Sequence, residues 1–98
     1  MDQPLPKRVV LSPNALFKVF QDEGVLLNLE TERYYVLDDV GARIWQVLAE
    51  RGEVAAALSS LLVEYQVDEG TLRRDLARLI GELVEAGLIV AEPAGIDP

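Results

Sequence analysis

The chain has 98 residues, half of them hydrophobic, which is enough for one domain with a packed core and hardly for two. It contains no cysteine and no histidine, which excludes disulfides and thiolate chemistry and removes the commonest general base and metal ligand. Seventeen acidic and nine basic residues give a net charge of −8, which repels nucleic acid unless the basic groups are clustered. With no signal peptide or membrane-length apolar run, we expect a soluble cytoplasmic protein.

The first half of the chain predicts β-strands. Three short apolar runs, at residues 16–20, 25–29 and 33–37, are rich in strand-forming residues. The polar segments between them are short, so an antiparallel meander is the simplest topology. We expect Gly24 to supply a positive φ in the first turn. Residues 9–11 predict a further short strand.

The second half predicts three helices. Asp38 or Asp39 is a good N-cap for the first helix, which is expected to run to Gly52. Apolar residues recur at helical spacing along it, with Trp45 among them. A second helix is expected at residues 53–65, where the apolar side chains form one stripe.

The third expected helix is capped by Asp68 and ends near Ala86, where Gly87 fits the left-handed position after a helix. Its apolar surface is wider than one stripe, because a row of Leu72, Leu76, Leu79 and Leu83 is flanked by Arg73, Ala77, Ile80 and Val84. Such a surface is either buried on two sides or forms the wall of a groove, and both interpretations stay open. Residues 88–90 predict a wing or a last strand, and residues 93–98 a frayed end.

No catalytic constellation is found in the sequence. The adjacent carboxylates of Asp38 and Asp39 are better explained as helix caps than as an acid/base pair. Ser59 and Ser60 have no histidine to activate them, and the glycines form no phosphate-binding loop. We therefore predict that the chain is not an enzyme and holds no metal and no cofactor.

Arg73, Arg74 and Arg78 cluster at the start of the third helix, which would be the recognition helix of a winged helix-turn-helix protein. A winged-helix DNA-binding regulator is therefore an alternative interpretation. Acidic residues on and beside the same helix and the total charge oppose it. The simplest interpretation of these arginines is that they lie on a solvent-exposed face of the helix.

Residues 33–37 would form an edge of the expected sheet. An edge strand has unpaired N–H and C=O groups and normally needs protection. In one interpretation a loop covers this edge, and Tyr35 and Leu37 lie in the core. In the other, a peptide pairs with the edge, and apolar side chains of the third helix provide pockets for it.

Residues 33–45 read RYYVLDDVGARIW, which resembles the signature Y-x-L-(N/D)-x-x-G-x-x-(I/V)-W of PqqD-like proteins. The order of the later segments also matches, so the resemblance covers roughly residues 15–92. Asp38 replaces the asparagine common in this family, which keeps the cap and adds a charge. The match is greatest with the stand-alone recognition elements of lasso-peptide clusters. The resemblance implies an α+β fold, in which a three-stranded antiparallel sheet precedes a trihelical, winged-helix-turn-helix-like bundle, as a single domain over residues 1–98.

The resemblance also implies a function. Such recognition elements bind the leader of a ribosomally synthesised precursor peptide by strand addition. They present it to a leader peptidase, a transglutaminase-like cysteine protease, and then to a cyclase, without nucleic acid or membrane. The positions that match the peptide-binding residues of the family are Arg33, Tyr34, Tyr35, Val36, Leu37, Arg73, Arg74, Leu76, Ala77 and Ile80. Gly41, Ala42 and Trp45 match the signature but are expected to serve packing. The alternative within the family is a chaperone for the precursor of pyrroloquinoline quinone.

Overall fold

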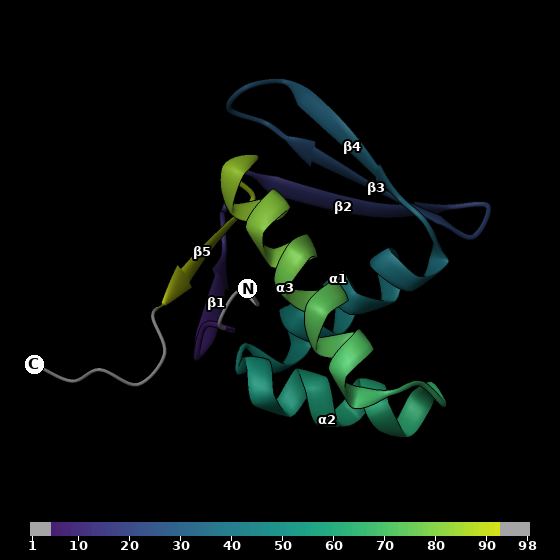
Figure 1. Ribbon diagram of the computed structural model, residues 1–98. Coiled ribbons are helices and arrows are strands. Elements are labelled where there is room, and N and C mark those ends of the chain that lie inside the picture. The colour runs from purple at the N-terminus through teal and green to yellow at the C-terminus, as the bar shows by residue number, and fades with distance from the viewer. Residues whose placement is uncertain (1–4, 93–98) are drawn as a thin grey trace, which may run out of the picture.

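A computed structural model describes residues 5–92 (Figure 1). The expected frayed end at residues 93–98 lies outside the described residues, as do residues 1–4. The elements follow in the order β1 (Arg8–Leu11), β2 (Ala15–Phe20), β3 (Glu23–Asn28), β4 (Arg33–Leu37), α1 (Asp39–Arg51), α2 (Val54–Glu64), α3 (Glu69–Glu85) and β5 (Ile89–Glu92). This is the predicted α+β fold, with a three-stranded sheet that precedes three helices.

The predicted meander is confirmed, because β2, β3 and β4 form an antiparallel sheet in that order. The first turn differs from the prediction. Gln21 and Asp22 adopt the positive φ angles, 52° and 70°, whereas Gly24 lies inside β3. A β-carbon on Gly24 would lie 2.7 Å from Cε1 of Phe17 and 2.8 Å from Cβ of Ala42. Gly24 is therefore required for close packing between the sheet and α1, and not for the turn.

Both predicted end strands form, and they pair with each other. β1 and β5 make a separate two-stranded antiparallel sheet beside the helices (Figure 1). β1 also contacts the junction of α1 and α2, because the N–H of Val9 donates to the carbonyl of Gly52 over 2.9 Å. Val9 is buried. β1 therefore contributes to the hydrophobic core of the domain.

The predicted helix caps are confirmed. Oδ1 of Asp38 accepts a hydrogen bond of 2.7 Å from the N–H of Gly41, and Oδ2 of Asp68 accepts one of 3.1 Å from the N–H of Thr71. Gly87 has a φ of 74° immediately after α3, which is the left-handed conformation expected there. Three helices therefore begin and end close to where the sequence predicts them.

One core joins the sheet to the helices. Trp45 of α1 is 3% exposed, and its ring lies 6.0 Å from the ring of Phe17 on β2. Leu26, at the centre of the sheet, is fully buried against the same cluster. The expected packing role of Trp45 is thus confirmed.

No helix within residues 5–92 is long and apolar enough to cross a membrane.

We predict that Gly24→Ala destabilises the fold by about 1–3 kcal/mol, because the new methyl group overlaps Phe17 and Ala42. Urea unfolding measures the loss. Gly81→Ala, within α3, is the control and is expected to be neutral or to stabilise through helix propensity. Equal stability of Gly24→Ala and the wild type would contradict the packing role of Gly24.

The ion pair between Arg43 on α1 and Glu64 on α2 predicts a pH dependence. The two side chains meet at 2.9 Å, and the hydrogen bond from the Arg43 guanidinium lowers the pKa of the Glu64 carboxyl. Because the folded-state pKa is the lower one, the stabilisation is present above the ordinary carboxyl pKa and is lost as the pH falls through the folded-state pKa. The difference in urea midpoint between wild type and Glu64→Gln should therefore shrink from about pH 7 to about pH 2.5. A difference independent of pH would contradict this.

Candidate peptide-binding site

β4 is an open edge of the three-stranded sheet, because no described strand lies beside it on the side away from β3. The side chains of Tyr34 and Val36 are 69% and 56% exposed on the outer face of the sheet. Tyr35 and Leu37 point to the opposite, helix-covered face and are half-buried. The predicted edge is therefore confirmed, and its side chains divide between the core and solvent.

The register of the sheet shows which backbone groups of β4 are unpaired. A two-residue turn with positive φ at both positions closes on a hydrogen-bonded pair, here Phe20 and Glu23. In antiparallel sheets such pairs alternate along a strand, so the β3 residues that do not bond to β2 bond to β4. Their partners on β4 are Arg33, Tyr35 and Leu37. It follows that the N–H and C=O groups of Tyr34 and Val36 face the open edge.

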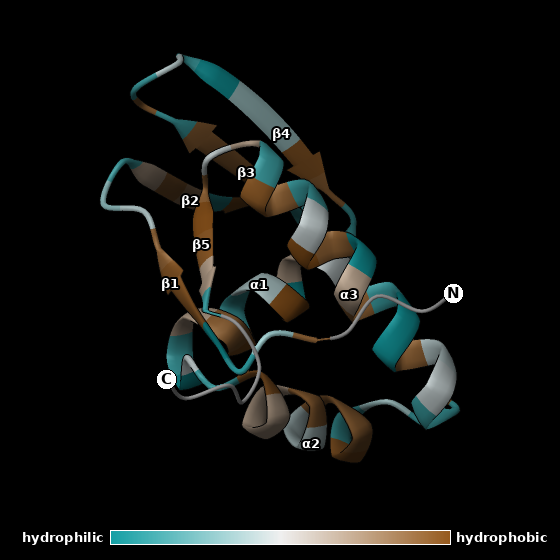
Figure 2. Cartoon of the chain, turned by 60° about the vertical axis from the view of Figure 1, so that its left-hand side comes forward, coloured by the Kyte–Doolittle hydropathy of each residue, from teal (hydrophilic) through white to brown (hydrophobic). Residues whose placement is uncertain are grey.

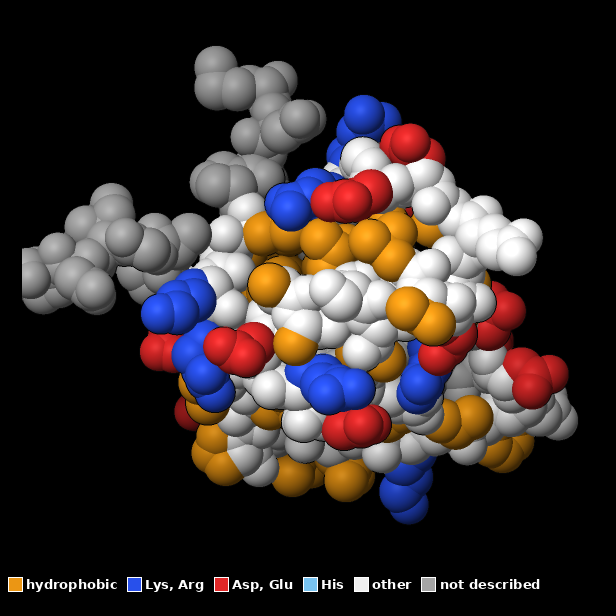
Figure 3. All heavy atoms as spheres, turned by 90° about the horizontal axis from the view of Figure 1, so that it is seen from below, with side chains coloured by type: hydrophobic (Ala, Val, Ile, Leu, Met, Phe, Trp, Pro, Cys, Tyr) orange, Lys and Arg blue, Asp and Glu red, His pale blue; other side chains and the backbone are white. Residues whose placement is uncertain are grey.

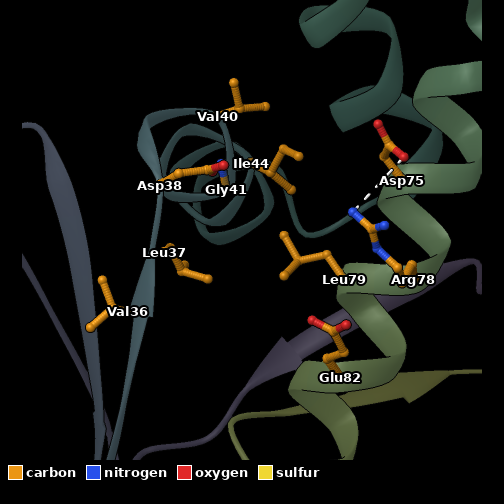
Figure 4. A pocket seen from close by; sticks show the side chains of 10 residues that line it. All are labelled: Val36, Leu37, Asp38, Val40, Gly41, Ile44, Asp75, Arg78, Leu79 and Glu82. Atoms are coloured by element: carbon orange, nitrogen blue, oxygen red, sulfur yellow. Dashed lines mark hydrogen bonds and ion pairs between the residues drawn. The ribbon is translucent and has the colours of Figure 1, made fainter.

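A pocket of about 410 Å³ lies beside this edge (Figure 4). It is enclosed by the end of β4, the first turns of α1 and the middle of α3. Its lining residues are Val36, Leu37, Asp38, Val40, Gly41, Ile44, Asp75, Arg78, Leu79 and Glu82. In Figure 4 the side chain of Leu79 extends from α3 towards Leu37 and Ile44. The lining therefore combines aliphatic side chains from all three elements with charged side chains of α1's cap and α3.

The strand residues of the predicted site are placed in two groups. Val36 and Leu37 line the pocket, whereas Arg33, Tyr34 and Tyr35 lie along the rest of the edge. β4 changes from hydrophilic at its start to hydrophobic at its end (Figure 2). The apolar end of the strand is thus the part beside the pocket.

The helix residues of the predicted site do not line the pocket. Leu76, Ala77 and Ile80 are 0%, 7% and 3% exposed and belong to the buried side of α3. Arg73 and Arg74 are exposed near the start of the helix, where Nε of Arg73 lies 3.2 Å from Oε2 of Glu69. The binding role of these five residues stays a prediction.

The cleft-facing side of α3 instead carries Asp75, Arg78, Leu79 and Glu82. At about 100° per residue, this side lies about half a turn around the helix from the row of Ala77 and Ile80. The two-stripe pattern is thus explained by burial of Ala77 and Ile80, while Val84 at the end of that row is 41% exposed. The sequence does hold a signal for Leu79, since it is the one member of the leucine row with charged residues at positions −4, −1 and +3.

The charges around the pocket do not favour DNA. Asp38, Asp75 and Glu82 provide three carboxylates against the single guanidinium of Arg78, which lies 4.0 Å from Oδ1 of Asp75. On the face seen from below, basic and acidic side chains are interspersed and form no basic patch (Figure 3). The face seen in Figure 3 thus lacks the cluster of basic groups that phosphate binding requires. No group of three acidic side chains within residues 5–92 could hold a metal ion.

Comparison with known proteins identifies the family. The family model described as coenzyme PQQ synthesis protein D (PqqD) matches residues 23–89. A solved structure of TbiB1 in complex with the TbiA(beta) leader peptide is 33% identical, with a TM-score of 0.76, and the match covers 89% of this chain and 98% of that one. A second structure, lasso peptide synthetase B1 complexed with the leader peptide, is 29% identical, with a TM-score of 0.75 over 85% and 98% of the two chains. No individually curated protein matches the chain. The chain belongs to the PqqD family, and its fold is that of the B1 proteins of lasso-peptide synthesis.

Proposed function

We propose that this protein is a non-catalytic adaptor that binds the leader segment of a lasso precursor peptide as an additional strand on β4. The observation that supports this most directly is the open edge at Tyr34 and Val36 beside a pocket of about 410 Å³. Two relatives of the same fold are complexed with leader peptides. The alternative, a chaperone for the pyrroloquinoline quinone precursor, has the family description in its favour, but both similar structures come from complexes with leader peptides rather than from that pathway's precursor.

Backbone pairing provides affinity in this proposal, and the pocket provides selectivity. A peptide strand beside β4 exchanges hydrogen bonds with Tyr34 and Val36, and every second peptide side chain points towards α3. The pocket accepts an apolar side chain, which contacts Leu37, Ile44 and Leu79. Peptide carboxylates pair with Arg73 and Arg74 at the start of α3. The buried Leu76, Ala77 and Ile80 support this wall of the cleft from behind.

Delivery is the remaining part of the proposal. The protein holds the leader and presents the rest of the precursor to a transglutaminase-like leader peptidase and then to a cyclase, in the cytoplasm. Because the sequence has neither cysteine nor histidine, the proposal assigns cleavage and ring closure to those partners.

Substitution by proline tests strand addition. In Val36→Pro the lost N–H faces the open edge, so the protein stays folded while the affinity for a fluorescein-labelled TbiA(beta) leader peptide falls about tenfold or more. In Tyr35→Pro the lost N–H is one that bonds to β3, so we expect a loss of stability instead. Fluorescence anisotropy measures binding, and circular dichroism measures folding. A folded wild type that does not bind the peptide, or a folded Val36→Pro that binds equally well, would contradict the proposal.

Substitution of Leu79 tests the pocket. Leu79→Ala removes an aliphatic wall and should weaken binding of the same peptide by about five- to thirtyfold. Val84→Ala is the matched control, because Val84 lies on the same helix and does not line the pocket. Its affinity should stay within about twofold of the wild type. Equal effects of the two substitutions would show that the peptide does not occupy this pocket.

A further inference from the structure

Asn28 is the one buried polar side chain among residues 5–92, with 2% exposure. Its Oδ1 accepts hydrogen bonds from the backbone N–H groups of Glu30 and Thr31, at 2.9 and 3.4 Å. Its Nδ2 donates to the carbonyl of Ala86 over 2.9 Å. Both ends of the amide are therefore used, one inside the β3–β4 hairpin and the other at the end of α3.

The end of α3 is shaped to receive this donor. Ala86 is the C-terminal capping residue of the helix, where carbonyl groups lack helical partners. A β-carbon on Gly87 would lie only 3.1 Å from Nδ2 of Asn28. Glycine at this position thus permits the positive φ and also the approach of Asn28.

Within the described residues, this contact is the single hydrogen bond that joins the three-stranded sheet to α3 or its cap. The C-terminal end of α3 lies close to the sheet, and the rest of the helix runs away from it (Figure 1). The bond of Asn28 therefore lies at the end of α3 that is nearest the sheet, and Leu79, about two turns earlier in the helix, lines the pocket. The first turn of α1, which follows β4 directly, bounds the cleft at its other end.

We infer that Asn28 is a positioning residue for peptide binding, which fixes the spacing and angle between β4 and α3. This inference rests on the proposed function. An added strand must bond to β4 and place its side chains against α3 at the same time. A small rotation of α3 about its end would disturb that fit. A peptide therefore loses affinity when this bond is lost, beyond any effect of reduced stability.

Asn28→Asp tests this role. The carboxylate still accepts from Glu30 and Thr31, but it has no donor for Ala86 and repels that carbonyl. The control is Val54→Ala, which removes buried volume in α2, far from the hairpin. Both variants are compared by affinity for the labelled TbiA(beta) leader peptide, at a temperature where each is folded. We expect a loss of about tenfold or more for Asn28→Asp and less than about twofold for Val54→Ala.

A second readout needs no peptide. The chain has no cysteine, so cysteines introduced at the exposed positions Arg33 and Arg74 carry spin labels on β4 and α3 alone. The distribution of distances between the labels should broaden with Asn28→Asp and stay unchanged with Val54→Ala.

If Asn28→Asp does not fold, Gly87→Ala disturbs the same contact from the other side and should broaden the distribution likewise. Equal affinity losses in Asn28→Asp and Val54→Ala, or an unchanged distribution, would overturn the inference. A wild type that does not bind the peptide would instead overturn the proposed function, and the label distances would still decide whether Asn28 positions the two walls.

Discussion

The backbone of β4 has hydrogen-bonding groups on two sides and a partner strand on one. Unpaired edges invite association with other chains, and folded proteins usually protect them. Here the edge is short, and its unpaired groups are limited to Tyr34 and Val36. β2 forms the other edge of the sheet but has no place in the lining of the pocket. The combination of open backbone and adjacent pocket therefore distinguishes β4 as the edge that is suited to accept a peptide.

The rest of the fold holds this edge in place. The close packing of Gly24 against Ala42 brings the sheet onto α1, and the contact of Phe17 with Trp45 fills the junction. The cap at Asp38 begins α1 immediately after β4, so the strand and the helix form two adjoining sides of the pocket. α3 provides the opposite wall, with its end linked to the hairpin through Asn28. The proposed peptide site thus depends on rigid positioning of a few groups, as an active site does.

Local patterns predicted the elements of this fold, because each was specified by nearby residues. Asp38 and Asp68 began helices as expected, and short polar turns gave the strand order. The turn before β3 was misassigned because Gln21 and Asp22 tolerate the positive φ that was expected of Gly24. The strand side of the site followed from edge topology and family resemblance. The α3 residues that line the pocket did not follow, because they lie about half a turn around the helix from the predicted ones, and the orientation of a helix depends on packing against distant elements.

Asn28 shows the same limit more sharply. In the sequence it is one polar residue near a turn, and a turn residue is usually exposed. Its burial depends on the carbonyl of Ala86, which lies 58 positions later in the chain. Contacts of this kind are set by the tertiary structure alone, so no local pattern reports them. The difference between the predicted binding residues on α3 and the residues that line the pocket has the same origin.

The central claim, that a leader pairs with the open edge of β4, is tested most directly by amide hydrogen exchange with and without the TbiA(beta) leader peptide. The account predicts that exchange at Tyr34 and Val36 slows when the peptide binds, while Tyr35 is protected in both states through its pairing with β3. Binding that leaves exchange at Tyr34 and Val36 unchanged would contradict it.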